Sequence, residues 1–392
     1  MNQDISFNKK IQLLVVKLWK NWLNFWLDFF QRILFKKLKS APKNILIHKI
    51  GNIGDIVFAV PSFINIRYAY PDAKITLLSS SGKKGSVGAK ELLNGVWYFD
   101  KQIIYYAEDI DSFKKKKDFV RNLRENHYDL FIQLPDDLAN FRILMRNMIF
   151  AKLLKAKSAF GFKIRTTQIF KKTQVDFLFD KTEAEGLFEL LKENGIGVLK
   201  AEFNFYVSDS SKNKVKNLLN KKWPNLNKKI VAVIGPGCKR EGNRWPIERF
   251  AQTAKYLENK YQAKIIIVGG RDDLARAKII ESGLKKENVL ITAGKLEPLE
   301  TFELLKYCSF LISNSTGVIH LGAAVGLPCV GVYSIRDVFG RWFPYGKNHK
   351  ILYHKFIDCD YRNEDCIKKS VEMISVEEVK NACDELLISK KI

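Results

Sequence analysis

The 392-residue sequence lacks the cysteine pattern of a metal site or of an oxidised framework. Its six cysteines are scattered, and none belongs to a Cys-x-x-Cys pair. The spacing of Cys359 and Cys366 has no matching second pair, so a zinc site is not expected. No secretory signal is evident. A reduced, cytosolic compartment therefore fits the sequence best.

The sequence also lacks a helix-turn-helix, zinc-finger or RRM signature. It does carry an excess of positive charge, with 66 Lys and Arg against 42 Asp and Glu and a net charge of +24. Such an excess attracts polyanions, which include nucleic acids, anionic lipid headgroups and phosphorylated sugars. Because no nucleic-acid motif accompanies the charge, we expect no nucleic-acid partner.

A third absence concerns the apolar segment at residues 11–38, which has no long uncharged run. A membrane-spanning helix needs about 20 nearly uncharged residues, whereas polar residues interrupt this segment at every turn. Its wide apolar face, its three tryptophans and its flanking lysines predict an amphipathic helix that lies on a membrane surface. A helix packed on the protein's own core or on a partner subunit is the alternative. Pro42 marks the boundary of the folded body, so residues 1–41 form a separate predicted segment.

From Pro42 onward, predicted strands alternate with predicted helices, which is typical of an α/β fold with parallel sheets covered on both faces. The polar stretch from Asp209 to Asn213 reads as a linker and helix cap. The chain is long enough for two domains with proper cores. We therefore expect one α/β domain over residues 42–209 and a second over residues 210–392.

In the first half, a glycine-bearing turn connects a predicted strand, Asn44–Lys49, to a helix. The turn contains Gly51, Asn52 and Gly54 and is followed by Asp55 in the first helical turn. Glycines let the backbone approach a ligand closely, and the start of a helix attracts anions. The turn lacks the third glycine of the dinucleotide fingerprint. Asp55 could alternatively do no more than complement the helix dipole.

In the second half, an apolar strand that ends at Ile312 runs into a polar turn and a small-residue helix. Ser315, Thr316 and Gly317 occupy this turn, and His320 lies one helical turn further on. A helix start at the carboxyl edge of a sheet offers unpaired N–H groups and a positive dipole end, which suit a phosphate or pyrophosphate. An ordinary helix cap is the alternative reading.

Two further loops of the second half carry candidate ligand-binding residues. The loop after the predicted strand Ile230–Ile234 contains Gly237, Lys239 and Arg244, and its glycines and cations suit a diphosphate. Asp273 follows the next strand, where its carboxylate could bind a ribose or cap the next helix. Strand–turn–helix sites in two separate halves suggest a ligand-binding cleft between two α/β domains.

These motifs, in this order, resemble the lipopolysaccharide heptosyltransferases, glycosyltransferase family 9, over nearly all of residues 43–388. The matching blocks are Lys49-x4-Gly54-Asp55 with Pro61, Gly235-Pro236-Gly237 through Arg244-Trp245-Pro246, Gly269-Gly270, Gly294-Lys295 with Leu299, Ser313-Asn314-x-Thr316-Gly317-x2-His320-Leu321, Arg341 with Pro344-Tyr345-Gly346, and Ile374 to Val379. The order and spacing of several motifs make the resemblance specific.

The resemblance implies a GT-B architecture, with two Rossmann-like domains facing across a cleft. The first would hold the acceptor and the second the nucleotide-sugar, and the last helix is a candidate for packing back on the first domain. Similar proteins invert the anomeric centre without a metal or another cofactor. Asp55 would then be the general base with Lys49 beside it, and Gly51, Asn52 and Gly54 would lie on the acceptor side.

For the donor, the resemblance implies binding by two groups of residues of the second domain. The Thr316-Gly317 turn would stabilise the leaving diphosphate. The other donor-binding residues would be Gly237, Lys239, Arg244, Asp273, Ser315 and His320. The donor would be ADP-heptose or a related nucleotide-sugar, and the acceptor an anionic, lipid-linked glycan such as a lipopolysaccharide core. The enzyme would lie peripherally on the inner face of the cytoplasmic membrane.

The sequence departs from the family pattern at two positions that bear on the donor. Ser315 stands where the family usually has Asp, and Asn243 stands where many members have Lys, so heptose is not the only candidate sugar. Another GT-B sugar-nucleotide enzyme such as an epimerase, or a non-catalytic nucleotide-binding scaffold, are the alternatives. The pairs Asp109-x-Asp111 and Asp358-x-Asp360 match a metal motif of a different glycosyltransferase fold and occur often by chance.

Overall fold

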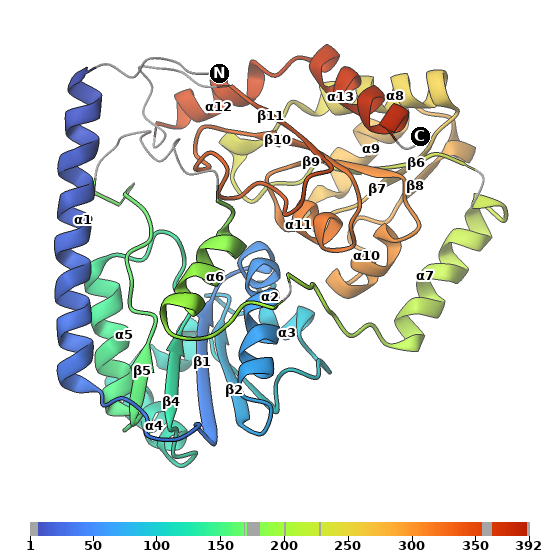
Figure 1. The fold of residues 1–392 in the computed structure, drawn as a ribbon. Helices are drawn as coiled ribbons and strands as arrows, with labels where there is room; N and C mark the ends of the chain where they lie inside the picture. Colours follow the sequence, from blue (N-terminus) through green and yellow to red (C-terminus); the bar gives the residue numbers. More distant parts are fainter. Residues whose placement is uncertain are drawn as a thin grey trace. The chain divides into compact units, whose positions relative to one another are not determined.

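The computed structural model describes residues 7–167, 169–170, 181–199, 201–226, 229–354 and 363–389. The chain divides into two compact units, Met1–Asn204 and Phe205–Ile392. This division lies close to the domain boundary expected at residues 209 and 210. Figure 1 follows the chain from blue in the first unit to red in the second.

The first unit contains a five-stranded, parallel sheet in the order β3-β2-β1-β4-β5. The strands are β1 (Asn44–Ile50), β2 (Lys74–Ser80), β3 (Lys101–Ile104), β4 (Leu130–Gln133) and β5 (Ser158–Phe160). The helices are α1 (Phe7–Leu34), α2 (Ile53–Ala69), α3 (Ala89–Leu92), α4 (Phe113–Arg124), α5 (Phe141–Leu153) and α6 (Glu183–Glu193). The five consecutive residues Ile45–Lys49 are all buried, as expected for a parallel strand that is covered on both faces.

Side chains of β1 alternate between two layers of helices. Leu46 joins a core with Leu123 of α4, Leu144 of α5 and Leu27 of α1. The residues on either side of Leu46 point to the opposite face, because successive side chains of a strand alternate. There α2 packs on β1, and α3 and α6 pack on α2. Lys49 therefore points toward the α2 and α6 layer.

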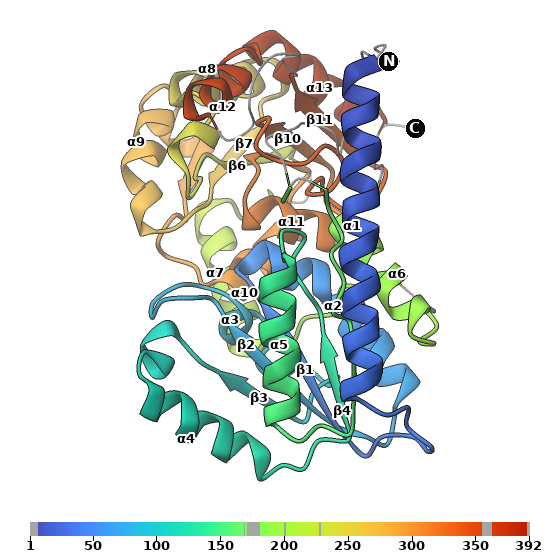
Figure 2. The same cartoon turned by 90° about the vertical axis from the view of Figure 1, so that its left-hand side faces the viewer.

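Helix α1 is part of the first unit and not a detached segment. It lies beside α5 in both ribbon views (Figures 1 and 2). Leu27 is fully buried in the core that α1 shares with α4 and α5. The side chain of Asn24 exchanges two hydrogen bonds with the backbone of Ile164, at 3.0 and 2.8 Å. The alternative of a helix on the protein's own core is thus correct for one face of α1.

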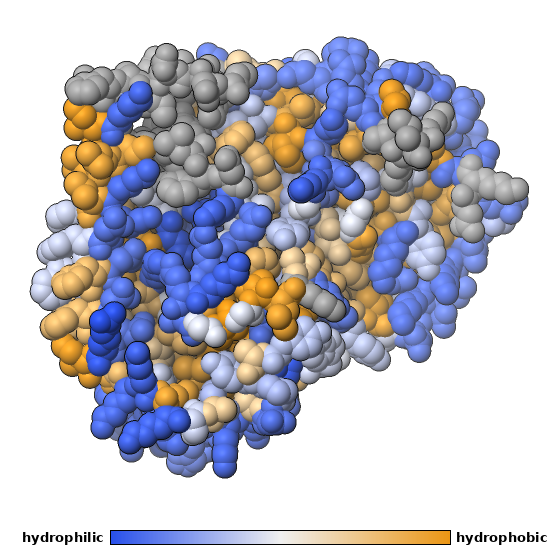
Figure 3. All heavy atoms as spheres, in the orientation of Figure 1, coloured by the Kyte–Doolittle hydropathy of each residue, from blue (hydrophilic) through white to orange (hydrophobic). Residues whose placement is uncertain are grey.

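The opposite face of α1 carries a row of exposed apolar side chains. Figure 3 shows orange spheres, mixed with paler ones, along the edge of the molecule where this helix lies. They are Ile11, Leu14, Val15, Leu18, Trp19, Trp22, Phe25, Phe29 and Ile33. We call this set the outer face of α1. Among the described residues, no helix has the length and apolar character needed to cross a bilayer.

The second unit contains a six-stranded, parallel sheet in the order β11-β10-β9-β6-β7-β8. The strands are β6 (Val231–Gly235), β7 (Lys264–Ile267), β8 (Val289–Ile291), β9 (Phe310–Asn314), β10 (Cys329–Tyr333) and β11 (His349–Tyr353). The helices are α7 (Asp209–Lys222), α8 (Ile247–Tyr261), α9 (Leu274–Ser282), α10 (Pro298–Leu305), α11 (Gly317–Ala324), α12 (Glu364–Glu372) and α13 (Val376–Ser389). Helices α8, α9 and α13 lie on one face of the sheet, and α10 and α11 lie on the other (Figure 1).

The second unit contains two elements that the sequence did not predict. Strand β11 and helix α12 were not predicted, because each is short and only partly buried. Helix α13 packs on α8 and β11 of its own unit, and its packing on the first unit stays a prediction.

Four cysteines are free thiols. Cys366 is disulfide-bonded, which the sequence analysis did not anticipate, and Cys359 lies outside the described residues.

Candidate active site

Each sheet has one point at which the strand order reverses direction. In the first unit this switch point lies between β1 and β4, and in the second it lies between β6 and β9. Parallel sheets bind ligands outside the carboxyl ends of the strands at such a point. Most of the predicted site residues follow these strands; Lys49 lies near the carboxyl end of β1, and Asp273 follows the neighbouring strand β7. The fold thus gathers them at the carboxyl edge of their own sheet.

The turn after β1 fixes the carboxylate of Asp55. Gly51 has φ of 156°, and a Cβ at this position would lie 2.2 Å from the Cβ of Asp55. Only glycine fits both conditions. Asn52 is the N-cap of α2, and its backbone N–H donates a hydrogen bond of 2.9 Å to Asp55 Oδ2. Gly54 lies in the first turn of the same helix. The glycine turn and the helix start thus hold Asp55 in one orientation.

The surroundings of Asp55 raise the pKa of its carboxyl. Asp55 keeps part of its surface open to solvent, but the surrounding protein desolvates the charged form, which is the largest effect. The positive charge of Lys49 and the Asn52 N–H oppose this effect, whereas the charges of Glu183 and Asp136 add to it. A carboxylate with a raised pKa is a stronger proton acceptor than an ordinary aspartate.

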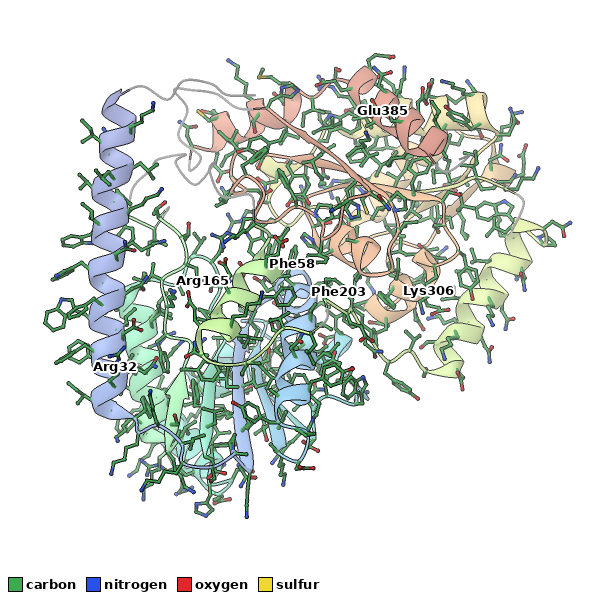
Figure 4. All side chains as sticks on the ribbon, viewed as in Figure 1. Arg32, Phe58, Arg165, Phe203, Lys306 and Glu385 are labelled. Atoms are coloured by element: carbon green, nitrogen blue, oxygen red, sulfur yellow. The ribbon has the colours of Figure 1, made fainter. Side chains whose placement is uncertain are left out.

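Lys49 belongs to a buried group of charges that lies beside Asp55. Its side chain is fully buried, and its Nζ lies 4.0 Å from Oε1 of Glu183. Arg165, which is labelled in Figure 4, forms an ion pair with the same carboxylate and donates a 3.0 Å hydrogen bond to the carbonyl of Pro135. Sequence analysis predicted Lys49 beside Asp55. It missed Glu183 and Arg165, which no local pattern marks, and it missed Asp136, which follows a predicted strand.

In the second unit, Asn314 joins the two loops at the switch point. Its Nδ2 donates a 2.9 Å hydrogen bond to the carbonyl of Pro236, and its Oδ1 accepts one of 3.0 Å from the backbone N–H of Trp245. Thr316 is the N-cap of α11, but its side chain makes no capping hydrogen bond. The N–H of Ile319 donates a 3.2 Å hydrogen bond to the carbonyl of Thr316. The N–H groups of Gly317 and Val318, the first two residues of α11, precede every carbonyl of their own helix that could accept them, so these two groups suit an anion.

The structure brings Gly237 and Asp273 into contact. A Cβ on Gly237 would lie 2.4 Å from Oδ2 of Asp273, so a larger residue would displace this carboxylate. The same Oδ2 accepts a 3.0 Å hydrogen bond from the N–H of Gly270. Asp273 therefore caps the short 3₁₀ helix Arg271–Asp273, whereas its side chain makes no capping hydrogen bond to α9. Its binding of a ribose stays a prediction. Its Oδ1 lies 3.5 Å from Nη1 of Arg276, so a ribose would compete with an existing partner.

Of the two cationic side chains in the loop after β6, Arg244 is held in place and Lys239 is not. Arg244 is partly buried and its Nε donates a 2.9 Å hydrogen bond to the carbonyl of Cys238, which leaves the guanidinium positioned at the loop. Lys239 is exposed. Burial and the charge of Asp337 raise the pKa of the Cys238 thiol to about 12. The thiol of this loop residue is therefore uncharged at neutral pH.

His320 lies in the first turns of α11, close to where the sequence placed it. It is buried, and burial lowers its pKa to about 3, with a smaller contribution from His349. Its ring lies 6.4 Å from that of Trp342, centroid to centroid. The imidazole is therefore neutral at physiological pH. It can take part in a hydrogen bond but cannot offer a positive charge to a phosphate.

Ser315 has a carboxylate for a neighbour, although it replaces an acidic residue of the family pattern. Burial raises the pKa of Asp337 to about 6, and a hydrogen bond from the Ser315 side chain opposes this shift. Asp337 follows β10, the next strand along the sheet from β9. The other departing residue, Asn243, is buried and accepts a 3.1 Å hydrogen bond from the hydroxyl of Ser334. Sequence analysis did not single out Asp337.

No group of three or more His, Cys, Asp or Glu side chains among the described residues is arranged to hold a metal ion. Asp109 caps a short helix through the N–H of Tyr106, at 2.9 Å, and Asp111 pairs with Lys115. The pair Asp358 and Asp360 lies outside the described residues.

The family model for "Glycosyltransferase family 9 (heptosyltransferase)" matches residues 117–371 of this chain. This stretch includes the whole six-stranded sheet of the second unit with its switch point. The chain belongs to glycosyltransferase family 9. It is therefore a glycosyltransferase, and the resemblance found in the sequence is confirmed.

Similar family 9 proteins cover most of the chain. Lipopolysaccharide heptosyltransferase 3 of Escherichia coli (strain K12) is 23% identical over 346 residues, which cover 85% of this chain and 95% of that protein. Among solved structures, a family 9 glycosyltransferase from Veillonella parvula has a TM-score of 0.73 at 18% identity, covering 91% of this chain and 99% of that one.

Two further solved structures are E. coli heptosyltransferases. ADP-heptose lps heptosyltransferase II has a TM-score of 0.63 at 18% identity and covers 89% of this chain and 100% of that one. Heptosyltransferase WaaC with ADP has a TM-score of 0.59 at 19% identity and covers 88% and 99%. These likenesses confirm the GT-B fold that the sequence motifs predicted.

Proposed function

We propose that this enzyme transfers heptose, or a closely related sugar, from an ADP-sugar to a lipopolysaccharide-core-like or other lipid-linked acceptor. The observation that carries the proposal is Asp55, a carboxylate of raised pKa that a glycine turn holds at the switch point of the first unit. Membership of family 9 supplies the reaction class. The similar proteins named for heptose transfer, and the similar structure with ADP, supply the substrate class.

In this proposal, the acceptor hydroxyl attacks the anomeric carbon of the donor from the face opposite the diphosphate. The new glycosidic C–O bond forms while the bond to the diphosphate oxygen breaks, so the anomeric configuration inverts. Asp55 takes the hydroxyl proton, and the positive charge of Lys49 favours the ionised form of this carboxyl. Gly51, Asn52 and Gly54 surround the acceptor side of this carboxylate. No metal takes part in this scheme.

Charge that develops on the leaving diphosphate needs stabilisation in the second unit. The N–H groups at the start of α11, next to Thr316 and Gly317, suit this role because a helix start attracts an anion. Arg244 and Lys239 add positive charge from the loop after β6, and Gly237 lets that loop approach the ligand. His320, being neutral, contributes a hydrogen bond only.

The reaction can be tested with purified protein and a panel of nucleotide-sugars. Thermal-shift measurements rank the donors, and the best donors are then offered with lipid-linked core glycans in the presence and absence of EDTA. We expect ADP release that depends on the acceptor, a product of inverted anomeric configuration by NMR, and no effect of EDTA. Release of nucleotide with an epimerised sugar and no acceptor would instead indicate an epimerase-like enzyme. Binding without any turnover would indicate a scaffold.

We further propose that the outer face of α1 docks the enzyme on the inner surface of the cytoplasmic membrane. Nine apolar side chains on one face of a single helix, two of them tryptophans, are typical of a helix lying in the headgroup region. The chain's net charge of +24 complements anionic lipids. The inner face of the same helix is already occupied by the core of the first unit, so docking would bring this unit, with its acceptor edge, to the lipid.

Vesicle co-sedimentation tests this docking. We expect the triple variant Leu18→Ser, Trp22→Ser, Phe25→Ser to lose binding to vesicles of phosphatidylglycerol and phosphatidylethanolamine while it keeps the wild-type melting temperature. The matched control replaces three exposed apolar side chains elsewhere in the first unit, Phe113, Leu138 and Leu199, by serine. Equal loss in both variants would contradict docking through α1. Deletion of the helix is unsuitable, because it would expose the core around Leu27.

A further inference from the structure

The first unit contains a buried cluster of charged side chains, and the reaction scheme above gives no role to two of them, Glu183 and Arg165. We define the Asp55 relay as Asp55, Lys49, Glu183 and Arg165. Lys49 and Glu183 have fully buried side chains, and that of Arg165 is only 6% exposed. The three lie in a chain, in which Nζ of Lys49 is 4.0 Å from Glu183 and Arg165 contacts the same Glu183 oxygen.

Burial of such a cluster costs free energy that a purely structural contact would avoid. Each buried ion carries a desolvation penalty of several kcal/mol, and apolar residues of similar size are often as stable or more stable. No hydrogen-bond acceptor among the described residues satisfies Nζ of Lys49, nor Nε and Nη1 of Arg165. Side chains that stay charged and incompletely paired in a core are candidates for a functional role.

Glu183 is not needed for the start of helix α6. Thr182 is the N-cap, and its N–H donates a 2.7 Å hydrogen bond to Oε2 of Glu185. The Glu185 N–H in turn bonds the Thr182 hydroxyl at 3.4 Å. This capping box satisfies the helix end without Glu183. The carboxylate of Glu183 instead pairs with Lys49 and Arg165, whose side chains lie in the interior of the first unit.

Arg165 connects the relay to the second acidic neighbour of Asp55. Its guanidinium pairs with Glu183 and also bonds the carbonyl of Pro135, at 3.0 Å. Pro135 directly precedes Asp136, whose charge acts on Asp55. One arginine thus fixes both α6 and the loop after β4, from which two negative charges act on the proposed base.

We propose that Glu183 and Arg165 are positioning residues that act through Lys49 to set the proton affinity of the Asp55 carboxylate. This inference rests on the proposed function only in naming Asp55 as the base. Glu183 draws the charge of Lys49 away from Asp55 and adds its own negative charge, which makes the base stronger. Arg165 neutralises part of Glu183 and limits this effect.

The two positioning residues act in opposite directions on Asp55, and this makes the proposal testable. The charged groups that act on Asp55 are Lys49 on β1, Asp136 after β4 and Glu183 on α6. Glu183→Gln removes a negative charge, so the acid limb of the kcat/KM profile should move to lower pH, with the plateau about two- to fivefold lower because a weaker base remains. Arg165→Gln removes a positive charge, so the acid limb should move to higher pH.

The controls separate this role from a merely structural one. Glu189→Gln makes the same charge change on an exposed position of α6 and should leave the acid limb in place. Arg165→Lys keeps the charge and should restore the wild-type limb more nearly than Arg165→Gln. Both buried variants are expected to lower the melting temperature, because each leaves a buried partner uncompensated. A structural defect alone would not move the two limbs in opposite directions.

A second readout does not depend on catalysis. The folded-state pKa of Asp55 lies above its unfolded value, so Asp55 contributes stability at low pH that is lost as pH rises through the folded pKa. The difference in unfolding free energy between wild type and Asp55→Asn, followed against pH, therefore reports this pKa. Its midpoint should fall in a Glu183→Gln background and rise in an Arg165→Gln background.

The two readouts have distinct outcomes. Midpoints and acid limbs that shift in opposite directions support the relay. Folded variants with unchanged midpoints overturn it, whatever their activity. If the wild-type protein transfers no sugar but the midpoints shift as expected, the relay stands and the proposed reaction fails.

Discussion

The switch points of the two units differ in the chemical groups that form them. In the first unit, side-chain charges dominate, with Asp55, Lys49, Glu183 and Arg165 close together and largely buried. In the second unit, a neutral amide, Asn314, holds the loops, and the proposed diphosphate site combines backbone N–H groups at a helix start with Arg244 and Lys239 of the loop after β6. Charged side chains can move a proton, whereas fixed N–H dipoles can only bind an anion.

This difference fits a division of labour between the units. A general base requires a titratable group whose pKa the surroundings adjust. A diphosphate site requires dipoles that are already in position before the ligand arrives. Changes at the first switch point should therefore affect kcat and its pH dependence, while changes at the second should affect the KM for the donor.

The largest effect on the first switch point is expected for Asp55→Asn. The amide is nearly isosteric but accepts no proton at neutral pH, so kcat should fall by about a hundred- to ten-thousand-fold while the donor KM changes little. Steady-state kinetics with saturating acceptor measure both values. Asp72→Asn, at an exposed site of the same unit, is the control. Wild-type kcat in Asp55→Asn would remove Asp55 from the role of base.

In the second unit, Asn314→Ala should show the opposite kinetic pattern. It removes the hydrogen bonds to Pro236 and Trp245 and leaves a buried N–H unpaired, so we expect a loss of about 1–3 kcal/mol of stability and a raised donor KM. Denaturant unfolding and donor titration measure the two effects. Ser309→Ala breaks a hydrogen bond to Val231 at the other end of β6, and it should lower stability without a change in KM.

A smaller effect is expected for Asp337→Asn, and it depends on pH. The folded pKa of about 6 exceeds the usual aspartate value of 3.8, so the contribution of Asp337 to stability is largest at low pH and is lost as pH rises through about 6. The full difference is roughly 3 kcal/mol. Asp337→Asn should therefore gain stability relative to wild type between pH 4 and pH 7. Melting temperatures across this range measure the gain, and a difference independent of pH would refute the assignment.

The smallest effect is expected for His320→Gln. Because the imidazole is already neutral above about pH 3, glutamine keeps a hydrogen-bonding group without any loss of charge. The donor KM should change by no more than about threefold, and the pH profile should keep its shape between pH 5 and pH 8. A loss of a titration near pH 6.5 in this variant would show that His320 is charged in the working enzyme.

Much of the local structure could be predicted from the sequence. Strand β4, strand β10 and helix α8 begin and end where the apolar runs, the glycines and the prolines predict. The turn from Gly51 to Asp55 was also predicted, since a glycine turn between a strand and a helix depends only on neighbouring residues. Such features follow from propensity and periodicity, which operate over a few residues.

The relay of buried charges could not be predicted in the same way. Glu183 looks like an ordinary first-turn carboxylate of a helix, and Arg165 follows a short strand without any motif. Their contact with Lys49 requires that the alternation of β1 turns this lysine toward the layer that contains α6. Likewise, Asn314 meets Trp245 across 69 residues of chain, and no local pattern records that contact.

Helix α1 separates what local residue patterns predict from what depends on tertiary packing. Residue patterns along the chain were enough to predict an amphipathic helix with a wide apolar face, most of the strands and helices, and the family motifs. Which half of the apolar face enters the core around Leu27, and which half stays exposed, became clear from the packing of the first unit. Secondary structure depends on nearby residues, whereas burial and pKa depend on the residues that the fold packs alongside.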